Sequence, residues 1–308
     1  MSAITRLRRE PLNTGGTDTA RYCYSVWLRH LIIARQRGLD ELPKTVLELG
    51  PGDSIGIGLA ALLSGANTYY ALDAFRYANI ERSLTVFDDL VGLFQRQESI
   101  PRDREAAEVE PKLPSYDFPL NLLQPERLTV FLAPERLDMI RRAIEKMNDP
   151  PSDPTHHIQL SYIAPWDQGA TIPSGSVDLI YSQAVLEHVK DLRTSYGEMY
   201  NWCRPGGCLS HQIDLRSHGT SLDWNGQWQY SEAQWKRVEN PQTYRYINRQ
   251  PSSEHIKLIQ ESGFDILTAI RGEDYSGIDR NNLASQWQRM ADEDITCYSL
   301  HVVACKPL

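Results

Sequence analysis

Hydrophobic positions in the first part of the chain fall into short apolar runs separated by turn residues. The runs Thr45–Gly50 and Thr68–Asp73 predict two buried strands, and the small apolar residues of 55–64 between them predict a helix that Gly65 ends. Apolar residues at helical spacing upstream predict another helix over 19–38. A strand, a turn, a helix and a second strand form the βαβ unit that begins a parallel sheet.

A long insertion follows this unit. About 85 residues separate Asp73 from the next predicted strand, 158–163, which is too long for a simple crossover. Within it, apolar residues at spacings of three and four predict amphipathic helices over 80–94 and 137–147. We interpret most of residues 80–150 as a helical cap over the sheet.

The second half of the chain resumes the alternation of strands and helices. A buried stripe from Leu186 to Cys203 predicts one helix, and 252–262 predicts another that Gly263 ends. A second insertion, 216–249, is rich in Trp, Gln and Asn, and the polar residues 1–18 predict a flexible arm ahead of one domain, 19–308. The remaining strands are predicted at 177–182, 208–213, 264–270 and 298–305.

Charge and hydropathy narrow the classes of partner. The 32 basic and 40 acidic side chains give a net charge of −8, so a nucleic-acid partner is not expected. Apolar stretches are shorter than the ~20 residues of a membrane span, and the polar N-terminus does not resemble a signal peptide. We therefore expect a cytoplasmic protein that acts on a small molecule; its oligomeric state is not readable from the sequence.

The five cysteines are odd in number and never spaced as C-x-x-C. This spacing argues against a zinc ribbon and against a disulfide framework. Cys297 and Cys305 lie in apolar segments and are expected to be buried small hydrophobic residues.

The segment Val46-Leu-Glu-Leu-Gly-Pro-Gly-Asp-Ser54 carries the chemistry. A strand ends in a glycine turn that leads into a helix, and Gly50 and Gly52 allow backbone amides to approach a ligand closely. Asp73 follows Gly50 by 23 residues, at the tip of the next strand, where a carboxylate can accept both hydroxyls of a ribose. The pattern predicts a nucleoside-binding crevice.

Two features of this turn bear on which nucleoside it binds. The dinucleotide fingerprint G-x-G-x-x-G fails, because Ile55 occupies its third glycine position. Glu48 lies two residues before Gly50, where a carboxylate would repel a pyrophosphate but suit the ammonium group of an amino acid. Both features favour S-adenosylmethionine over NAD.

With these residues the chain resembles class I S-adenosylmethionine-dependent methyltransferases of the type 11-like group. Glu48-Leu-Gly-Pro-Gly52 resembles their motif I, with Ser54 in place of a third glycine, and Asp73 matches their acidic ribose-binding position. Ser176 to Val189 resembles their motif IV region, and Arg204-Pro-Gly-Gly207 the turn before their fifth strand. The resemblance implies an α/β, Rossmann-like seven-stranded sheet, mostly parallel with an antiparallel last strand, flanked by helices.

The resemblance also implies further cofactor contacts for S-adenosyl-L-methionine and its product S-adenosyl-L-homocysteine. Asp167 is the nearest match to the adenine-binding acid, with Trp166 as a stacking residue, and Ala74 follows Asp73 along the crevice. His188 would either touch a ligand or simply bond a neighbour on its helix. The methionine moiety is expected beside the strand tip formed by Ser182, Gln183 and Ala184.

A candidate catalytic pair follows the fifth strand. His218, oriented by Asp214, would act as the general base for a hydroxyl acceptor; the alternative is a pair that only anchors the loop. His211 lies mid-strand and is expected to point into a helix layer. Because Asp214 and His211 are three apart on one strand, they face opposite sides, and no metal site is predicted.

Residues 210–219 and 230–249 resemble a methyltransferase branch associated with glycan and secondary-metabolite assembly, which implies a sugar or metabolite hydroxyl as acceptor. Arg249 would pair with an acidic group of the acceptor or with a surface carboxylate. Five aromatic residues of the second insertion would either line the acceptor pocket or pack this insertion on the sheet: Trp224, Trp228, Tyr230, Trp235 and Tyr244.

Two other functions remain open. An NAD-dependent reductase or epimerase would need hydride-side chemistry such as a Tyr-x-x-x-Lys pair, which the chain lacks. A protein that binds S-adenosylmethionine without turnover would keep Glu48, Gly50, Gly52 and Asp73 all the same.

Overall fold

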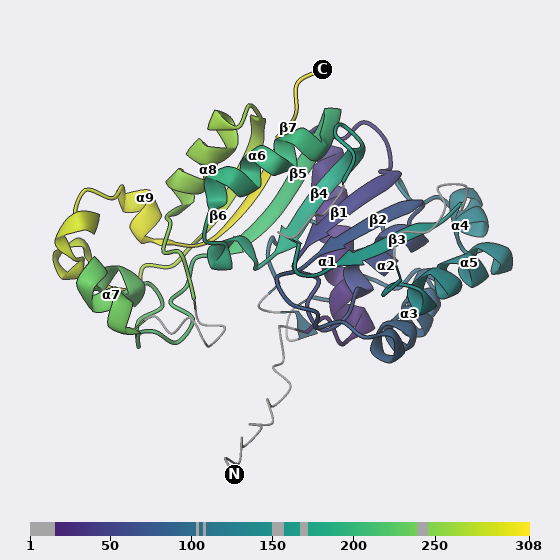
Figure 1. The fold of residues 1–308 in the computed structure, drawn as a ribbon, viewed down its shortest axis with the longest axis horizontal. Helices are drawn as coiled ribbons and strands as arrows, with labels where there is room; N and C mark the ends of the chain where they lie inside the picture. Colours follow the sequence, from purple (N-terminus) through teal and green to yellow (C-terminus); the bar gives the residue numbers. More distant parts are fainter. Residues whose placement is uncertain (1–15, 103–104, 107–108, 150–156, 167–171, 239–245) are drawn as a thin grey trace, which may run out of the picture.

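The computed structural model describes residues 16–102, 105–106, 109–149, 157–166, 172–238 and 246–308. Its centre is a seven-stranded sheet in the order β3-β2-β1-β4-β5-β7-β6 (Figure 1). The strands are β1 (Thr45–Leu49), β2 (Thr68–Leu72), β3 (Gln159–Ile163), β4 (Val177–Gln183), β5 (Cys203–Asp214), β6 (Asp265–Glu273) and β7 (Cys297–Cys305). Only β7 runs antiparallel to its neighbours, which confirms the predicted sheet.

Helices cover both faces of this sheet. One layer contains α1, α2 and α3, which contact one another, and the other contains α6 and α8 (Figure 1). The helices are α1 (Ala20–Arg37), α2 (Gly56–Leu63), α3 (Ile80–Gln95), α4 (Pro125–Phe131), α5 (Pro134–Glu145), α6 (Leu192–Trp202), α7 (Glu232–Val238), α8 (Ser252–Glu261) and α9 (Asp292–Ile295).

The side chains of strand β1 alternate between the two helix layers. Val46 belongs to the hydrophobic cluster on the α1–α2 side, whereas Leu47 and Leu49 belong to the cluster with α6 and α8. Because successive side chains of a strand point to opposite faces, Glu48 shares the face of Val46. A strand buried on both faces explains why the run is apolar almost throughout.

The long insertion after β2 forms helices and one extended loop. The predicted amphipathic helices are present as α3 and α5, which contact each other, while α5 also contacts β3. The loop after α3 is anchored on α1 by Arg29, which is 1% exposed and donates to the carbonyls of Pro101 (2.9 Å) and Pro111 (2.6 Å). The same loop brings Glu110 to Gln183 at the end of β4 and to Tyr298 on β7.

The helix predicted from Leu186 to Cys203 is wrong at both ends. A short 3-10 turn, η2 (Leu186–His188), follows β4, and α6 begins only at Leu192. Asp191 caps α6 by accepting from the N–H of Thr194 (3.0 Å), which starts a new helix at this position. Cys203 is already the first residue of β5.

The cysteine prediction is also corrected. Cys208 on β5 and Cys305 on β7 are directly paired across the antiparallel ladder and form a disulfide. Their sequence separation of 97 hides this neighbourhood, because only the sheet order brings the two strands together. Cys297 is buried, as predicted, and is free together with Cys23 and Cys203.

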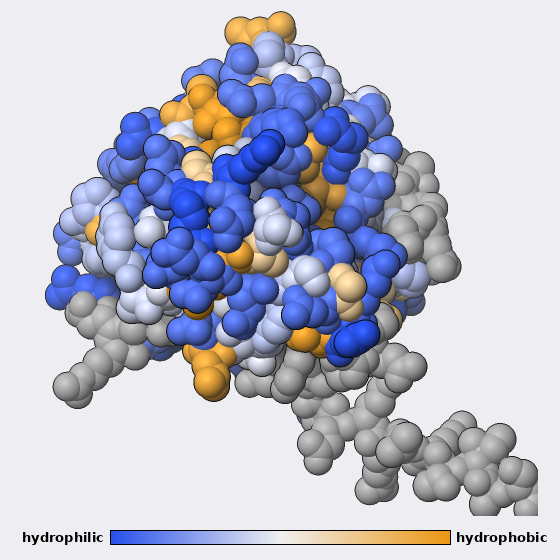
Figure 2. Space-filling view, turned by 90° about the vertical axis from the view of Figure 1, so that its left-hand side faces the viewer, coloured by the Kyte–Doolittle hydropathy of each residue, from blue (hydrophilic) through white to orange (hydrophobic). Residues whose placement is uncertain are grey.

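The second insertion packs on the segment between β6 and β7, which the sequence pattern did not identify as a unit. Trp228 is fully buried in a small hydrophobic cluster with Leu283, Met290 and Ile295. In Figure 1, α7 and α9 lie together at the opposite end of the molecule from α4 and α5. Figure 2 shows that this end is mainly hydrophilic, with hydrophobic residues in small separate groups, as expected for a surface in contact with water.

None of the helices in the described ranges has the length and apolar character needed to cross a bilayer.

Candidate functional site

The turn after β1 has the backbone that the glycines predict. Gly50 and Gly52 have φ values of +65° and +74°, and the N–H of Gly50 donates to the carbonyl of Leu72 (2.7 Å) at the end of β2. A Cβ at position 50 would lie 2.5 Å from Cγ2 of Val185, the residue that follows the tip of β4. Glycine is therefore required at position 50 for both its conformation and its space.

Asp73 lies where the ribose-binding acid was predicted. Its carboxylate is 7% exposed and accepts from the N–H groups of Gly52 (3.3 Å) and Phe75 (3.4 Å). Burial raises the pKa of this carboxyl to about 6. Both hydrogen bonds are long, so the carboxylate keeps acceptor capacity for ligand hydroxyls. Ala74, the next residue, is exposed.

Glu48 does not lie open in the crevice. Its carboxylate is 2% exposed and accepts from the hydroxyls of Tyr69 (2.5 Å) and Tyr181 (3.1 Å), on the strands that flank β1. Burial raises the pKa of Glu48 to about 7 against the opposing effect of these two bonds. Two tyrosines that the sequence analysis did not consider enclose this carboxylate, and its contact with a ligand ammonium stays a prediction.

Ser54 supports the turn from behind. It is fully buried, its hydroxyl donates to the carbonyl of Thr17, and its oxygen accepts from the N–H of Gly56 at the start of α2 (3.0 Å). These bonds assign Ser54 to the structure of the turn instead of to ligand contact. Thr17 is 6% exposed, so the last residues of the predicted flexible arm belong to the folded domain.

The three residues predicted at the tip of β4 have different surroundings. Ser182 is fully buried and bonds Nδ1 of His211 on β5 (2.8 Å), which places it away from the crevice because alternate strand residues face opposite sides. Gln183 is half-buried, with its amide held by Nε2 of His30 (3.1 Å) and the carbonyl of Glu110 (3.3 Å). Ala184 has a φ of +52° and donates its N–H to Gln212.

Trp166 lies beside Asp73, because its N–H donates to the Asp73 carbonyl (3.0 Å). Its half-buried ring packs edge-on against Trp202 of α6, with centroids 6.3 Å apart. The ring therefore borders the crevice on the α6 side. Asp167, the predicted adenine-binding acid, falls outside the described residues.

Asp214 contacts His218, but through its backbone carbonyl (3.5 Å from Nε2) and not through a hydrogen bond to its carboxylate. Arg216 donates to the Asp214 carboxylate from Nε (2.9 Å) and Nη2 (2.7 Å). Nε2 of His218 lies 3.9 Å from the same carboxylate, beyond hydrogen-bond distance. Burial disfavours the ionised form, but the bonds from Arg216 and the nearby His218 hold the pKa of Asp214 below its ordinary value. An arginine two residues along the chain reaches this carboxylate more directly than the imidazole does.

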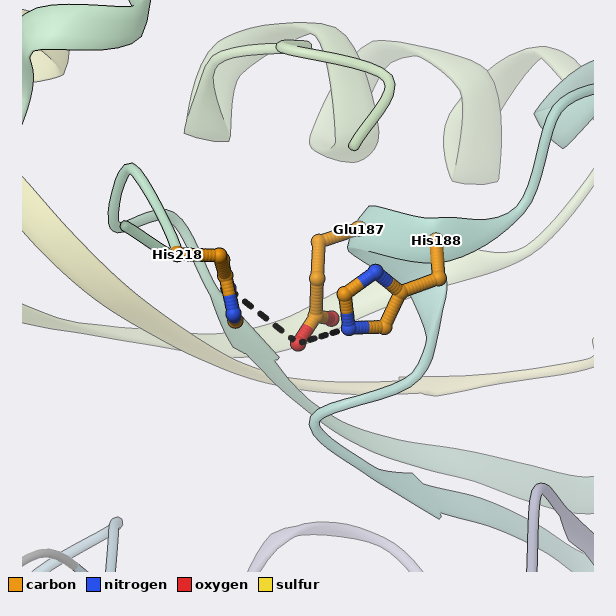
Figure 3. Close-up of side chains that lie close together, drawn as sticks. All are labelled: Glu187, His188 and His218. Carbon is orange, nitrogen blue, oxygen red and sulfur yellow. Dashed lines mark ion pairs between the residues drawn. The ribbon is translucent and has the colours of Figure 1, made fainter. Parts of the chain in front are cut away.

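A carboxylate that the sequence analysis missed faces His218 (Figure 3). Glu187 in η2 is 3% exposed, and its Oε1 lies 4.0 Å from Nε2 of His218 and 3.9 Å from Nε2 of His188. Burial, together with the charge of Asp214, raises the pKa of Glu187 well above its usual range. His188 donates from Nδ1 to the carbonyl of Tyr246 (2.7 Å). It thus bonds a protein neighbour, which was the alternative to ligand contact, and its other ring nitrogen faces Glu187.

A cavity of about 570 Å³ lies next to this group, where β5, β6 and β7 meet. Asp214 and Arg216 line it, together with three carboxylates from distant parts of the chain, Glu110, Glu273 and Asp274. Trp224 also lines it, as predicted for one of the aromatic residues. The cavity size is typical of a small-molecule site.

Two further aromatic residues of the second insertion belong to the packed interior. Trp228 and Trp235 are buried, and Tyr244 lies outside the described residues. Arg249 is 5% exposed, pairs with Glu232 and lies 4.5 Å from the ring centroid of Trp235. The packing interpretation therefore holds for these two tryptophans, and Arg249 has the surface carboxylate of its alternative interpretation, since the Glu232 side chain is 65% exposed.

Comparisons with solved structures give matches of low sequence identity that extend over most of this chain. An S-adenosylmethionine-dependent methyltransferase from Mesorhizobium loti is 15% identical, with 85% of this chain and 90% of that chain covered and a TM-score of 0.39. Phosphoethanolamine N-methyltransferase 2 of Haemonchus contortus, solved with S-adenosylhomocysteine, is 14% identical, with 96% and 59% covered and a TM-score of 0.46. A search among curated protein sequences finds no match.

The match to a family model is more extensive. It spans residues 27–269, from α1 into β6, and includes the glycine turn, Asp73 and the cluster around His218. The family is described as a methyltransferase domain. The match favours methyl transfer over the NAD-dependent alternative. The chain belongs to this methyltransferase family.

Proposed function

We propose that this methyltransferase methylates a hydroxyl of a small molecule, a sugar or a secondary metabolite. The observation that carries the proposal is the cavity of about 570 Å³ lined by Asp214, whose carboxylate lies 3.9 Å from Nε2 of His218. Its polar wall suits an acceptor with many hydroxyls, because carboxylates accept hydrogen bonds from them.

The residues around the crevice fit the cofactor. The turn of Gly50 and Gly52 presents backbone without side chains, and the buried Asp73 has spare acceptor capacity for a ribose. Trp166 and Gln183 border the same edge of the sheet. When bound, S-adenosylmethionine supplies an electrophilic methyl group on a sulfonium. Glu48 contributes from beneath the turn, where it joins β1 to its two neighbouring strands.

His218 is the proton acceptor of the proposal. Its side chain is 25% exposed, and its Nε2 lies between the carboxylates of Glu187 (4.0 Å) and Asp214 (3.9 Å). The Asp214 carboxylate, whose lowered pKa keeps it ionised, lies 3.9 Å from this nitrogen and stabilises the imidazolium that forms when the acceptor hydroxyl gives up its proton. This arrangement replaces the hydrogen-bonded pair expected from the sequence.

The cavity wall also supports a second candidate, N-methylation. Four carboxylates face one guanidinium among the lining residues: Glu110, Asp214, Glu273 and Asp274 against Arg216. An excess of negative charge attracts a protonated amine as well as sugar hydroxyls.

The test is transfer of an isotope-labelled methyl group from S-adenosylmethionine to panels of sugars, aminosugars and phenolic metabolites. We expect incorporation into at least one acceptor, with an O-methyl signal by NMR; an N-methyl signal would select the second candidate. Asp73→Ala serves as the cofactor-deficient control. Cofactor binding without methyl incorporation into any panel would refute both candidates and favour a non-catalytic binding protein.

A further inference from the structure

A buried carboxylate near the proposed acceptor cavity accepts no hydrogen bond from another side chain. Glu187 is 3% exposed, and in the described part of the chain the only hydrogen-bond donors that act on its oxygens are the backbone N–H groups of Glu187 and Asp214, from outside good hydrogen-bond geometry. An ionised carboxylate without such bonds costs several kcal/mol to bury. A positive charge at this place would offset the cost.

Two imidazoles converge on the same carboxylate (Figure 3). His188 comes from the same 3-10 turn as Glu187, and His218 comes from the loop after β5. One oxygen of Glu187 and one nitrogen of each histidine all lie within 4.8 Å of one another. The three side chains thus present one oxygen and two nitrogens to a common point.

The hydrogen bond behind His188 leaves its inner nitrogen free to coordinate. Nδ1 lies 2.7 Å from the carbonyl of Tyr246, and a carbonyl only accepts, so Nδ1 carries the hydrogen. In the neutral ring Nε2 then has the lone pair, and this nitrogen faces Glu187. Metal-binding histidines are commonly oriented by a bond of this kind from the other ring nitrogen to a backbone carbonyl.

The charges around the group also suit a cation. Asp214 lies 3.9 Å from Nε2 of His218, and Arg216 holds this carboxylate through two nitrogens. Arg216 also acts on Glu187, because its positive charge lowers the pKa of that carboxyl against the larger effect of burial.

We propose that Glu187, His188 and His218 bind a divalent transition-metal cation, of which Zn²⁺ is the best match. Imidazole nitrogen with one carboxylate oxygen suits Zn²⁺ and its neighbours in the first row better than Mg²⁺ or Ca²⁺, which prefer oxygen ligands. At Zn²⁺ bond lengths of about 2.0–2.1 Å, tetrahedral ligand atoms lie roughly 3.3 Å apart. The observed 3.9 and 4.0 Å separations need each side chain to move by less than 1 Å.

Three protein ligands leave a coordination position open, which is typical of catalytic zinc sites. A role in catalysis rests on the proposed function. With the cation on Nε2 of His218, that nitrogen no longer accepts a proton. An acceptor hydroxyl bound at the open position ionises more readily: its O–H bond breaks, the proton leaves to water and the electron pair stays on oxygen. Metal-free and metal-bound protein would thus activate the hydroxyl in different ways.

The test is direct binding of the metal alone to the full chain without an affinity tag, after chelator treatment and dialysis. Calorimetry with Zn²⁺ and the visible spectrum with Co²⁺ should show one site per chain. We expect Glu187→Gln and His218→Ala each to weaken binding at least about 100-fold, and His188→Ala to do the same from a more exposed position. His157→Ala, which removes an exposed imidazole elsewhere, is the matched control and should bind as the wild type does.

Absence of saturable binding by the wild type would overturn the proposal, as would unchanged affinity in the folded ligand variants. Circular dichroism establishes folding, and His188→Ala provides the test if Glu187→Gln does not fold. Calorimetry with S-adenosylhomocysteine separates this inference from the proposed function. Metal binding without cofactor binding refutes the function alone, whereas cofactor binding without metal binding refutes only the metal site.

Discussion

Asp73→Ala tests the assignment of the cofactor crevice. The substitution removes a carboxylate that is 7% exposed and retains acceptor capacity beyond its bonds from Gly52 and Phe75. Loss of a hydrogen bond to a charged group in such a place costs ~1 to 3 kcal/mol. The dissociation constant for S-adenosylhomocysteine should therefore rise roughly 5- to 150-fold.

The pH dependence provides a second, sharper readout of the same residue. Burial raises the pKa of Asp73 to about 6, and ribose hydroxyls donate to its ionised form. Affinity of the wild type should fall as pH drops through about 6, by up to about tenfold between pH 7 and pH 5. Asp73→Ala should lack this component, so the difference between the two proteins isolates Asp73 from other titrating groups.

Isothermal titration calorimetry at several pH values measures both effects. Asp178→Asn is the control, because this carboxylate binds the backbone of Lys44 and Thr45 at the opposite edge of the same sheet. We expect the control to lose stability but keep ligand affinity. Unchanged affinity in folded Asp73→Ala, or the same pH profile in both proteins, would show that the crevice has been placed wrongly.

Three further predictions concern catalysis and stability. His218→Ala should lower turnover ~10² to 10⁴-fold in methyl-transfer assays with cofactor affinity preserved, and a near-normal rate would exclude it as the base. Gly58→Ala should destabilise the protein by ~2 to 4 kcal/mol in urea unfolding, because its Cβ would lie 1.9 Å from the Tyr69 ring. The control Gly197→Ala lies on an exposed helix face with open space around it and should stabilise the protein by ~0.5 to 1 kcal/mol. Equal effects of the two substitutions would contradict this packing. Burial lowers the pKa of His211 and His255 to about 3, so each histidine takes up a proton on unfolding at pH values below its unfolded pKa of about 6.5. Each should therefore reduce the free energy of unfolding by about 1.3 kcal/mol between pH 7 and pH 5.5. Urea midpoints of His255→Gln that fall as steeply with pH as those of the wild type would refute this.

Local sequence was sufficient for the elements that build the cofactor crevice. Apolar runs bounded by glycine predicted β1, α2 and β2, and the spacing from Gly50 to Asp73 predicted which residues would meet at the sheet edge. These features depend on contacts between residues close in sequence, where periodicity and turn chemistry determine the structure. The family resemblance added the antiparallel last strand, which a strand pattern alone does not specify.

The start of α6 shows where a local pattern misleads. Leu186, Leu192 and Tyr196 are all buried, and their spacing fits one helix, but the cap at Asp191 divides the segment. A hydrophobic stripe shows which residues are buried, but it does not show whether a single helix continues through them. Because the pattern placed Glu187 and His188 in a helix, it did not show that they lie in a short turn that faces His218.

The acceptor side was determined by tertiary structure. Arg216 outcompeted His218 for Asp214, and Glu187 approached His218 only because η2 and the loop after β5 lie together. The cavity draws Glu110 from the insertion and Glu273 from β6, which are more than 160 residues apart in the chain. Sequence alone determined where the glycine turn of the proposed cofactor crevice would form, since that depends on local residues. The surroundings of each carboxylate depended on which distant strands and loops the sheet order brings into contact, because charge and burial act through space.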